Sequence, residues 1–221
     1  MQVHSHLVGS ESQPILIIDD VAPSPNALLQ DAISTCTDLF EGGLYPGLRT
    51  RTMPAYHKFL IDTINRATSL TGVNLSQVSQ GESYFSMVTR EANTLSPLQC
   101  IPHFDQPEPD HIAVVHYLCD HHFGGTSFYR HRQTGYEYVD KGREATYLAS
   151  LEEGMKHHPP VRDYIRHSTP LFEQIFTVEA KFNRLIAYRC SSLHSGNLRQ
   201  GFRPILNPYA GRFTATAFLR S

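Results

Sequence analysis

The sequence predicts an α+β fold in which two helices precede a β-sandwich or barrel. The first observation behind this is a pair of helically spaced apolar stripes before residue 72. The second is a series of short alternating segments that begins at residue 83. The predicted strands cover residues 83–90, 111–119, 125–132, 135–140, 176–182, 183–190 and 211–220.

The N-terminal region is expected to supply a strand and the two helices. Residues 14–20 form an apolar run closed by two carboxylates, which is typical of a buried strand. Asn26 is the expected N-cap of the first helix, whose apolar stripe runs through Leu28, Leu29, Ala32, Ile33 and Cys36 to Leu39 and Phe40. Residues 41–54 predict a charged loop, and residues 55–70 a second helix with Phe59, Leu60, Thr63 and Ile64 facing inward.

Residues 211–220 show the clearest strand alternation. Arg212, Thr214, Thr216 and Phe218 are expected on one face, and Phe213, Ala215, Ala217 and Leu219 on the other. Residues 144–174 differ from the strands around them, because they have a helical pattern that Pro159 and Pro160 interrupt. We expect them to be a helical insertion between two strands.

Composition limits the classes of function. The chain has 221 residues, 40% of them hydrophobic, and a formal net charge of -2, so nothing attracts it to nucleic acid or to an anionic membrane. Its four cysteines are isolated and the start of the chain lacks a signal-peptide pattern, which favours a soluble, cytoplasmic protein. We expect one domain over residues 1–221, with an N-terminal part (1–82) and a strand-rich core (83–221) that carries the insertion.

Three side chains have the pattern of a metal site. His103 and Asp105 are two residues apart, so an extended segment would place both on one face. His194 follows the apolar strand at 183–190, and two packed sheets can bring such distant strand ends together. Two imidazoles and one carboxylate on one face leave open coordination positions, as in non-haem Fe(II) oxygenases.

The region after residue 116 contains Tyr117, Leu118, Asp120, Gly124, Gly125, Thr126 and Phe128. In order and spacing these residues match a Y-L-N-D-x-x-x-G-G-x-T-x-F segment, and the chain here resembles the prolyl 4-hydroxylase branch of the Fe(II)/2-oxoglutarate-dependent dioxygenases. The branch's S-L-H-x-G and G-K-W-x-A-T-x-W segments are matched by Ser192, Leu193, His194, Gly196, Gly211, Arg212, Ala215, Thr216 and Phe218. The GGTxFYRHRxTG stretch also resembles uncharacterised bacterial relatives of this superfamily.

The resemblance implies a double-stranded β-helix, or jelly roll, that binds Fe(II) and 2-oxoglutarate. Such an enzyme uses O2 to oxidise a C–H bond, most simply as a hydroxylase, and releases succinate and CO2. The basic residue that binds the distal carboxylate of 2-oxoglutarate is either Arg203 or Arg212. We choose Arg212, because it opens a regular strand with Thr214 on the same face, whereas Arg203 lies in a loop. Tyr84 and Tyr117 are candidate hydrogen-bond donors to the cosubstrate.

Arginines are dense near the expected mouth of the site. The candidates for contact with substrate are Arg49, Arg51, Arg130, Arg132, Arg162 and Arg166. Guanidinium groups pair well with carboxylates, which favours a small anionic, zwitterionic or amino-acid-like substrate. The insertion would then act as a lid, bringing Arg162 or Arg166 to the acidic group, or alternatively as a contact in a homodimer.

Two other functions remain open from the sequence. A cupin-like metal-binding or sensor module without oxygenase activity would be favoured if the strand arginine faced solvent. A zinc hydrolase could use the same three ligands, but no additional Glu or His near residues 103–105 is placed as a general base.

Overall fold

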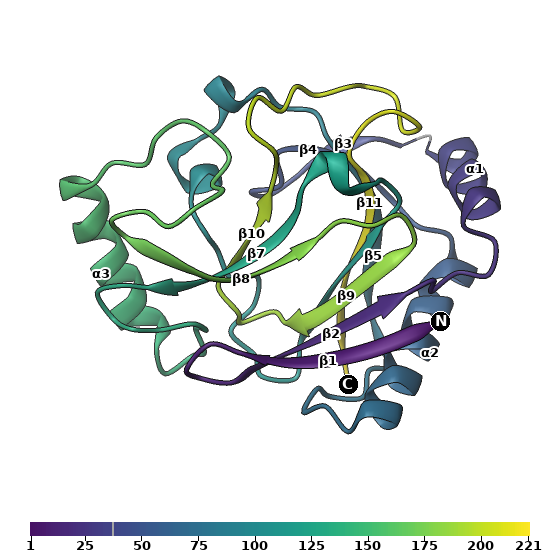
Figure 1. The fold of residues 1–221 in the computed structure, drawn as a ribbon, viewed down its shortest axis with the longest axis horizontal. Coiled ribbons are helices and arrows are strands. Elements are labelled where there is room, and N and C mark those ends of the chain that lie inside the picture. Colours follow the sequence, from purple (N-terminus) through teal and green to yellow (C-terminus); the bar gives the residue numbers. More distant parts are fainter. Residues whose placement is uncertain (37) are drawn as a thin grey trace.

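The computed structural model describes residues 1–36 and 38–221, whose strands form two antiparallel sheets (Figure 1). In this part of the chain the larger sheet has eight strands, in the order β1-β2-β9-β6-β11-β5-β4-β3. They are Gln2–Val8 (β1), Gln13–Asp19 (β2), Phe40–Glu41 (β3), Gly47–Arg51 (β4), Gln80–Val88 (β5), Ile112–Tyr117 (β6), Arg184–Arg189 (β9) and Phe213–Arg220 (β11). The smaller sheet has the order β10-β7-β8, with His194–Asn197 (β10), Gly125–His131 (β7) and Phe172–Glu179 (β8).

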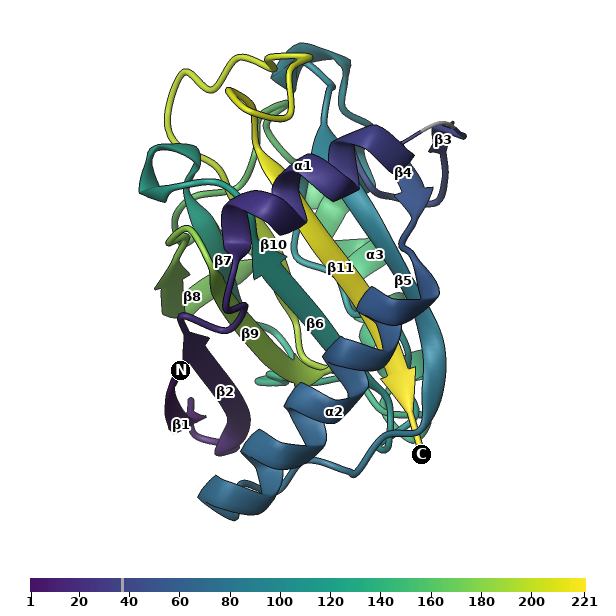
Figure 2. The ribbon, with the colours of Figure 1, turned by 90° about the vertical axis from the view of Figure 1, so that its right-hand side faces the viewer.

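The helices cover the larger sheet and flank the site region. Figure 2 shows α1 (Pro25–Thr35) and α2 (Pro54–Thr71) lying across one face of the larger sheet, with the smaller sheet and α3 (Glu144–His157) behind it. Three short 3-10 helices are Ala92–Thr94 (η1), Pro97–Cys100 (η2) and His121–Phe123 (η3). The predicted arrangement of helices and a β-sandwich is therefore confirmed at the level of two packed antiparallel sheets.

Strand β11 divides the interior of the protein into two regions. Phe213, Ala215, Ala217 and Leu219 belong to the apolar core between the larger sheet and the helices. The alternate side chains, Arg212, Thr214, Thr216 and Phe218, line a cavity on the opposite face. The predicted alternation is confirmed, and it separates a core that stabilises the fold from the wall of a cavity.

The first helix is shorter than its apolar stripe suggested. Helix α1 begins at Pro25 after Ser24, so Asn26 is not the N-cap, and it ends at Thr35. Proline at the first helical position fixes φ near the helical value and needs no hydrogen-bond partner for a backbone N–H. Leu39 and Phe40 lie beyond the helix with exposed side chains, and residue 37 lies outside the described part of the chain.

Strand pairing accounts for most other differences from the sequence-based expectations. The segment predicted as a charged loop contains β4, which pairs with β5 from Gly47 to Arg51. A Cβ at Gly47 would lie 2.0 Å from the backbone oxygen of Met87, so this pairing needs glycine at that position. Strand β1 was not predicted, whereas the predicted strand at 135–140 makes only an isolated bridge between Tyr138 and Ser192.

The insertion is helical only in its first half. Helix α3 ends at His157, and Pro159 and Pro160 end the helical pattern, as proline removes a donor and disfavours helix before it. Residues 158–171 are irregular, and β8 begins at Phe172. Tyr147 and Leu151 are buried in a cluster with Ile101 and Phe172, whereas Leu148 is exposed.

No helix among the described residues is long and apolar enough to cross a membrane.

A buried histidine on the helix side of β6 predicts acid sensitivity. His116 Nδ1 lies 2.7 Å from the Tyr56 hydroxyl, and Nε2 lies 3.2 Å from Asn183 Oδ1. Asn183 Oδ1 also accepts a hydrogen bond from the Ala22 backbone N–H, which identifies it as the acceptor. We infer that His116 Nε2 donates to Asn183 and that Nδ1 accepts from Tyr56.

Burial lowers the pKa of His116 to about 4, with the Asn183 contact opposing it. In the unfolded chain His116 binds a proton near pH 6.5, whereas in the folded chain its pKa is about 4. The free energy of unfolding therefore decreases as the pH falls from about 6.5 to about 4. The expected loss is roughly 3 kcal/mol of unfolding free energy. Urea titrations should show that His116→Gln reduces this loss, while the exposed control His4→Gln should keep it. An unchanged loss in His116→Gln would contradict the assignment.

Candidate active site

An extended segment after η2 positions the first two candidate metal ligands. His103 and His194 exchange backbone N–H to O hydrogen bonds of 2.9 Å each, and Asp105 N donates to Cys190 O at 2.8 Å. Phe104, between the two, packs edge-on against Tyr147 of α3, with ring centroids 5.9 Å apart. The i, i+2 alternation thus sends Phe104 into an apolar cluster and the two polar side chains to the opposite side.

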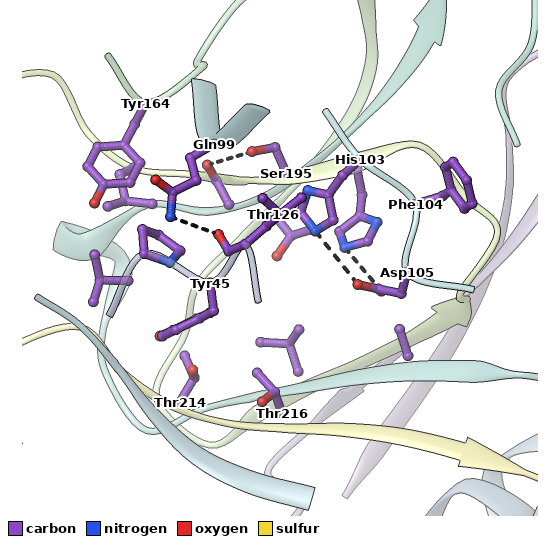
Figure 3. Close-up of a pocket in the computed structure, with 18 of the residues that line it drawn as sticks. Tyr45, Gln99, His103, Phe104, Asp105, Thr126, Tyr164, Ser195, Thr214 and Thr216 are labelled. Carbon is purple, nitrogen blue, oxygen red and sulfur yellow. Dashed lines mark hydrogen bonds and ion pairs between the residues drawn. The ribbon is translucent and has the colours of Figure 1, made fainter. Parts of the chain in front are cut away.

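The third candidate, His194, begins β10 rather than closing the preceding strand as expected. The candidate ligand atoms of His103, Asp105 and His194 all lie within 4.8 Å of one another (Figure 3). The distances are 3.7 Å from His103 Nε2 to Asp105 Oδ1 and 3.6 Å from His194 Nε2 to Asp105 Oδ2. His194 Nδ1 lies 2.9 Å from Ser192 O, so Nδ1 carries the proton and the Nε2 lone pair faces Asp105.

The electrostatics of this group favour the neutral imidazole of His103. Burial lowers the pKa of His103 to about 3, and the nearby His194 and Arg49 lower it further. Burial raises the pKa of Asp105, while His194 and Arg49 oppose that rise. Asp105 Oδ2 is buried and has no hydrogen-bond partner among the described residues. Two imidazoles and an under-bonded carboxylate form the donor set that suits a divalent metal such as Fe(II).

The three side chains border a cavity of about 290 Å³ between the two sheets. Figure 3 shows His103 and Asp105 at one side of it, Thr214 and Thr216 from β11 below, and Tyr164 at the far side. Asp105 is the one carboxylate among the described lining residues, whereas two arginines, Arg49 and Arg212, line it. The Nε atoms of both arginines are buried without a hydrogen-bond partner in the described structure.

The structure distinguishes Arg212 from Arg203, the two candidates for binding the distal carboxylate of 2-oxoglutarate. Arg212 is 5% exposed, lines the cavity beside Thr214 and donates from Nη2 to Gly125 O at 3.1 Å. Arg203 lies in the irregular segment between β10 and β11, with an exposed side chain. Of these two, only Arg212 can meet a ligand in this cavity.

Neither candidate tyrosine lines the cavity. The hydroxyl of Tyr84 is paired with the carboxylate of Glu82 on the same strand. The hydroxyl of Tyr117 lies 2.7 Å from Thr126 Oγ1, and burial raises its pKa to about 12. Thr126 does line the cavity, so Tyr117 supports the cavity wall from behind. The expectation that the two tyrosines contact cosubstrate directly is not met by these positions.

Three of the six candidate substrate arginines form ion pairs away from the cavity. Arg51 pairs with Glu82, Arg130 with Glu137 and Glu173, and Arg166 with Asp163. Arg132 donates to Thr169 O, and Arg162 is exposed without lining the cavity. Arg49 alone among the six lines the cavity. The geometry therefore favours Arg49, because a local carboxylate neutralises the guanidinium of each of the three paired arginines.

Sequence reasoning missed Tyr45, which lines the cavity and stacks on Arg49. It lies in a Gly- and Pro-rich segment that was interpreted as a loop. The usable signal was the following stretch, Gly47–Arg51, in which Arg49 and Arg51 alternate with Leu48 and Thr50 as in an edge strand.

A second group of potential ligands, Asp120, His121 and His122, is fully on the surface at η3. Asp120 Oδ1 caps the turn by accepting a hydrogen bond from His122 N at 2.8 Å.

The fold has counterparts among solved structures. The non-haem alpha-ketoglutarate-dependent epimerase SnoN from nogalamycin biosynthesis is similar with a TM-score of 0.51 and 11% identity, over 94% of this chain and 78% of that chain. HygX from Streptomyces hygroscopicus, crystallised with nickel and 2-oxoglutarate, has a TM-score of 0.48 and 12% identity, over 93% of this chain and 82% of its own.

Comparison of the sequence itself leads to a single family. No curated protein matches the chain significantly. The family described as "Family of unknown function (DUF6445)" matches residues 1–219, nearly the full length of the chain. The protein is a member of the DUF6445 family, with a fold that it shares with SnoN.

Proposed function

We propose that this protein is a non-haem Fe(II)- and 2-oxoglutarate-dependent oxygenase that oxidises a C–H bond of a small molecule. The observation that carries the proposal is the presence in one cavity of the His103, Asp105 and His194 donor set and the buried, under-bonded Arg212. Bound together, Fe(II) and 2-oxoglutarate would supply the oxidation by O2, with release of succinate and CO2.

The strand order supports a double-stranded β-helix as the finer description of the fold. After residue 80 the chain passes from β5 in the larger sheet to the bridge residue His103, then to β6, and then to β7 and β8 in the smaller sheet. It returns through β9, β10 and β11, which alternate between the two sheets. The bridge from His103 to His194 extends the smaller sheet beyond β10. This alternation is the pattern of a jelly roll.

We propose that residues 1–221 form one such domain in which the N-terminal part supports the β-helix. Strands β1, β2, β3 and β4 extend both edges of the larger sheet, and α1 and α2 pack on its outer face. The assignment to the prolyl 4-hydroxylase-like branch remains part of the proposal, supported by the matched motifs around Gly124 and His194.

The protein's own residues would each act on a defined part of the ligands. His103, Asp105 and His194 would hold the metal, and the Ser192 carbonyl would fix the tautomer of His194 through its Nδ1–H. Arg212 would bind the distal carboxylate of 2-oxoglutarate through its free N–H groups. The apolar side chains Val88, Leu98 and Leu198 would exclude water from the reacting C–H bond.

The alternatives fit the cavity less well. A sensor module that lacks a cosubstrate would not need a buried arginine with an unpaired N–H, because burying such a charge is costly. A zinc hydrolase needs a general base beside the metal, and the described cavity lining offers no carboxylate besides Asp105.

The decisive measurement is the absorption spectrum of the anaerobic protein. Addition of Fe(II) and 2-oxoglutarate together should produce a weak visible charge-transfer band, because both must share one centre. Fe(II) alone and 2-oxoglutarate alone are the controls. Absence of the band with both present would contradict the proposed function.

The irregular half of the insertion is proposed to close the outer side of the cavity. Tyr164 lines the cavity, packs edge-on against Phe202 and donates its hydroxyl hydrogen to Arg90 O at 2.7 Å. Tyr164→Ala should release 2-oxoglutarate roughly fivefold faster, because an aromatic contact contributes about 1 kcal/mol. The rate is the decay of the charge-transfer band after mixing with excess iron chelator under anaerobic conditions.

Val161→Ala is the control, since Val161 belongs to the same irregular segment, is 81% exposed and does not line the cavity. Equal release rates in Tyr164→Ala and the wild-type protein would refute the closing role and leave a dimer contact as the role to test.

A further inference from the structure

Arg49 is held in the cavity by aromatic rings rather than by a carboxylate. Its guanidinium carbon lies 4.2 Å from the centroid of the Tyr45 ring, 5.8 Å from that of Tyr84 and 6.0 Å from that of Phe218. Stacking of this kind occupies the face of the planar group and leaves its N–H edge free for a ligand. The position of the guanidinium is therefore fixed while its hydrogen-bonding capacity is left unused.

The neighbouring arginine in the same strand has an ordinary structural role in a surface ion pair. Arg51, two residues along β4, pairs with Glu82 at 3.1 Å, and its side chain is 72% exposed. Arg49 makes no ion pair within 4.0 Å with any described residue, and its Nε is buried without a partner. A buried cation without a counter-ion is destabilising unless a ligand supplies the missing charge.

The two arginines come from different strands and meet different parts of the cavity wall. Arg212, from β11, donates from Nη2 to Gly125 O in the smaller sheet at 3.1 Å. Arg49, from β4, instead has its guanidinium over the rings of Tyr45 and Phe218. One dianionic cosubstrate that chelates the metal and reaches Arg212 would therefore leave Arg49 free.

The formal charges of the complete site also leave Arg49 without a counter-ion. With Fe(II), Asp105, dianionic 2-oxoglutarate and Arg212 in place, the positive and negative charges cancel. The charge of Arg49 then remains, so the complete site needs one more anion. The described cavity lining has no second carboxylate that could pair with a substrate ammonium group.

We propose that Arg49 binds the carboxylate of the prime substrate, which is a small monocarboxylic acid with an apolar body and no free α-ammonium group. This inference rests on the proposed function, because it assigns Arg212 and the metal to 2-oxoglutarate. The apolar body would lie against Leu44, Pro46 and Tyr164, which line the same cavity. A free amino acid is disfavoured, since its ammonium group would lose its hydration without gaining a partner.

The first arm of the test separates substrate from cosubstrate. Calorimetry of 2-oxoglutarate binding to Ni(II)-loaded protein should give the same affinity for wild type, Arg49→Gln and Arg51→Gln, and a large loss for Arg212→Gln. Failure of the wild-type protein to bind 2-oxoglutarate would contradict the proposed function. A loss in Arg49→Gln equal to that in Arg212→Gln would overturn the Arg49 assignment alone.

The second arm uses matched probes on protein saturated with Ni(II) and 2-oxoglutarate. The probes are 3-phenylpropionate, its primary amide and phenylalanine, together with hexanoate, hexanamide and norleucine. The two acids should bind and raise Tm, whereas the amides and amino acids should not. Arg49→Gln should weaken acid binding by roughly tenfold or more, as expected for a lost charge-assisted hydrogen bond, and Arg51→Gln should not. Equal binding of acids and amides, no effect of Arg49→Gln, or no binding of either acid would overturn the proposal.

Discussion

Asp105→Ala should abolish Fe(II) binding and leave the fold intact. Asp105 is the only anionic member of the donor set, and its Oδ1 and Oδ2 lie within 3.7 Å of the two imidazole Nε2 atoms. Loss of a residue that merely supports a ligand costs roughly 10- to 100-fold in metal affinity, so loss of the carboxylate itself should exceed about 100-fold. Anaerobic equilibrium dialysis against Fe(II) measures this directly.

The fold is expected to survive because Asp105 is tied to the protein through its backbone. Its N–H donates to Cys190 O, and alanine keeps that hydrogen bond. Circular dichroism and Tm of Asp105→Ala measure whether the fold is intact. Asp120→Ala is the control, since Asp120 belongs to the exposed group at η3 and not to the cavity. Stoichiometric iron in Asp105→Ala, or loss of iron in Asp120→Ala alone, would place the metal elsewhere.

The placement of His103 and Asp105 on one face was predictable because their spacing is local. They share a face whenever their segment is extended, and the apolar Phe104 between them has a separate place against Tyr147. Strand β11 was equally predictable, since one of its faces is covered by apolar core and the other lines a cavity. In both cases side chains alternate between the two faces of an extended segment, and this alternation determines the result.

Strand β4 was less predictable because its pairing is imposed by its neighbours. Strand β4 contains Gly47 and two arginines and has little strand character of its own, but its partner β5 is a buried strand of the larger sheet. The stretch at 135–140 has the better strand composition, yet it finds only one bridging partner. Tertiary context therefore decided these elements against local propensity.

The candidate substrate arginines could not be ranked from the sequence, for an electrostatic reason. Sequence places a charge along the chain but does not reveal its counter-ion. Arg130 meets Glu137 at 2.6 Å and Glu173 at 2.9 Å, and these come from different parts of the fold. Arg49 was indistinguishable from Arg51 until the structure showed a carboxylate beside one and aromatic rings around the other.

Arg212→Gln should weaken 2-oxoglutarate binding far more than any change at Arg203. Arg212 lies in the cavity with an unpaired Nε, so its loss would leave the distal carboxylate buried without a counter-ion. Truncating one partner of such a pair costs about 2 to 5 kcal/mol, which corresponds to a rise in Kd of roughly 30- to several-thousandfold. Calorimetry on Ni(II)-loaded protein provides Kd without turnover.

Arg203→Gln is the matched control, because it removes the same charge from an exposed position in the segment that leads to β11. Its Kd should stay within about twofold of the wild-type value, since exposed charges are screened by solvent and salt. Arg212→Lys should recover part of the affinity, because an ammonium group keeps the charge but cannot form two parallel hydrogen bonds. If Arg203→Gln instead caused the larger rise, the segment at 198–212 would have to close over the cavity in the complex, and Arg212 would serve only the Gly125 carbonyl that it already contacts.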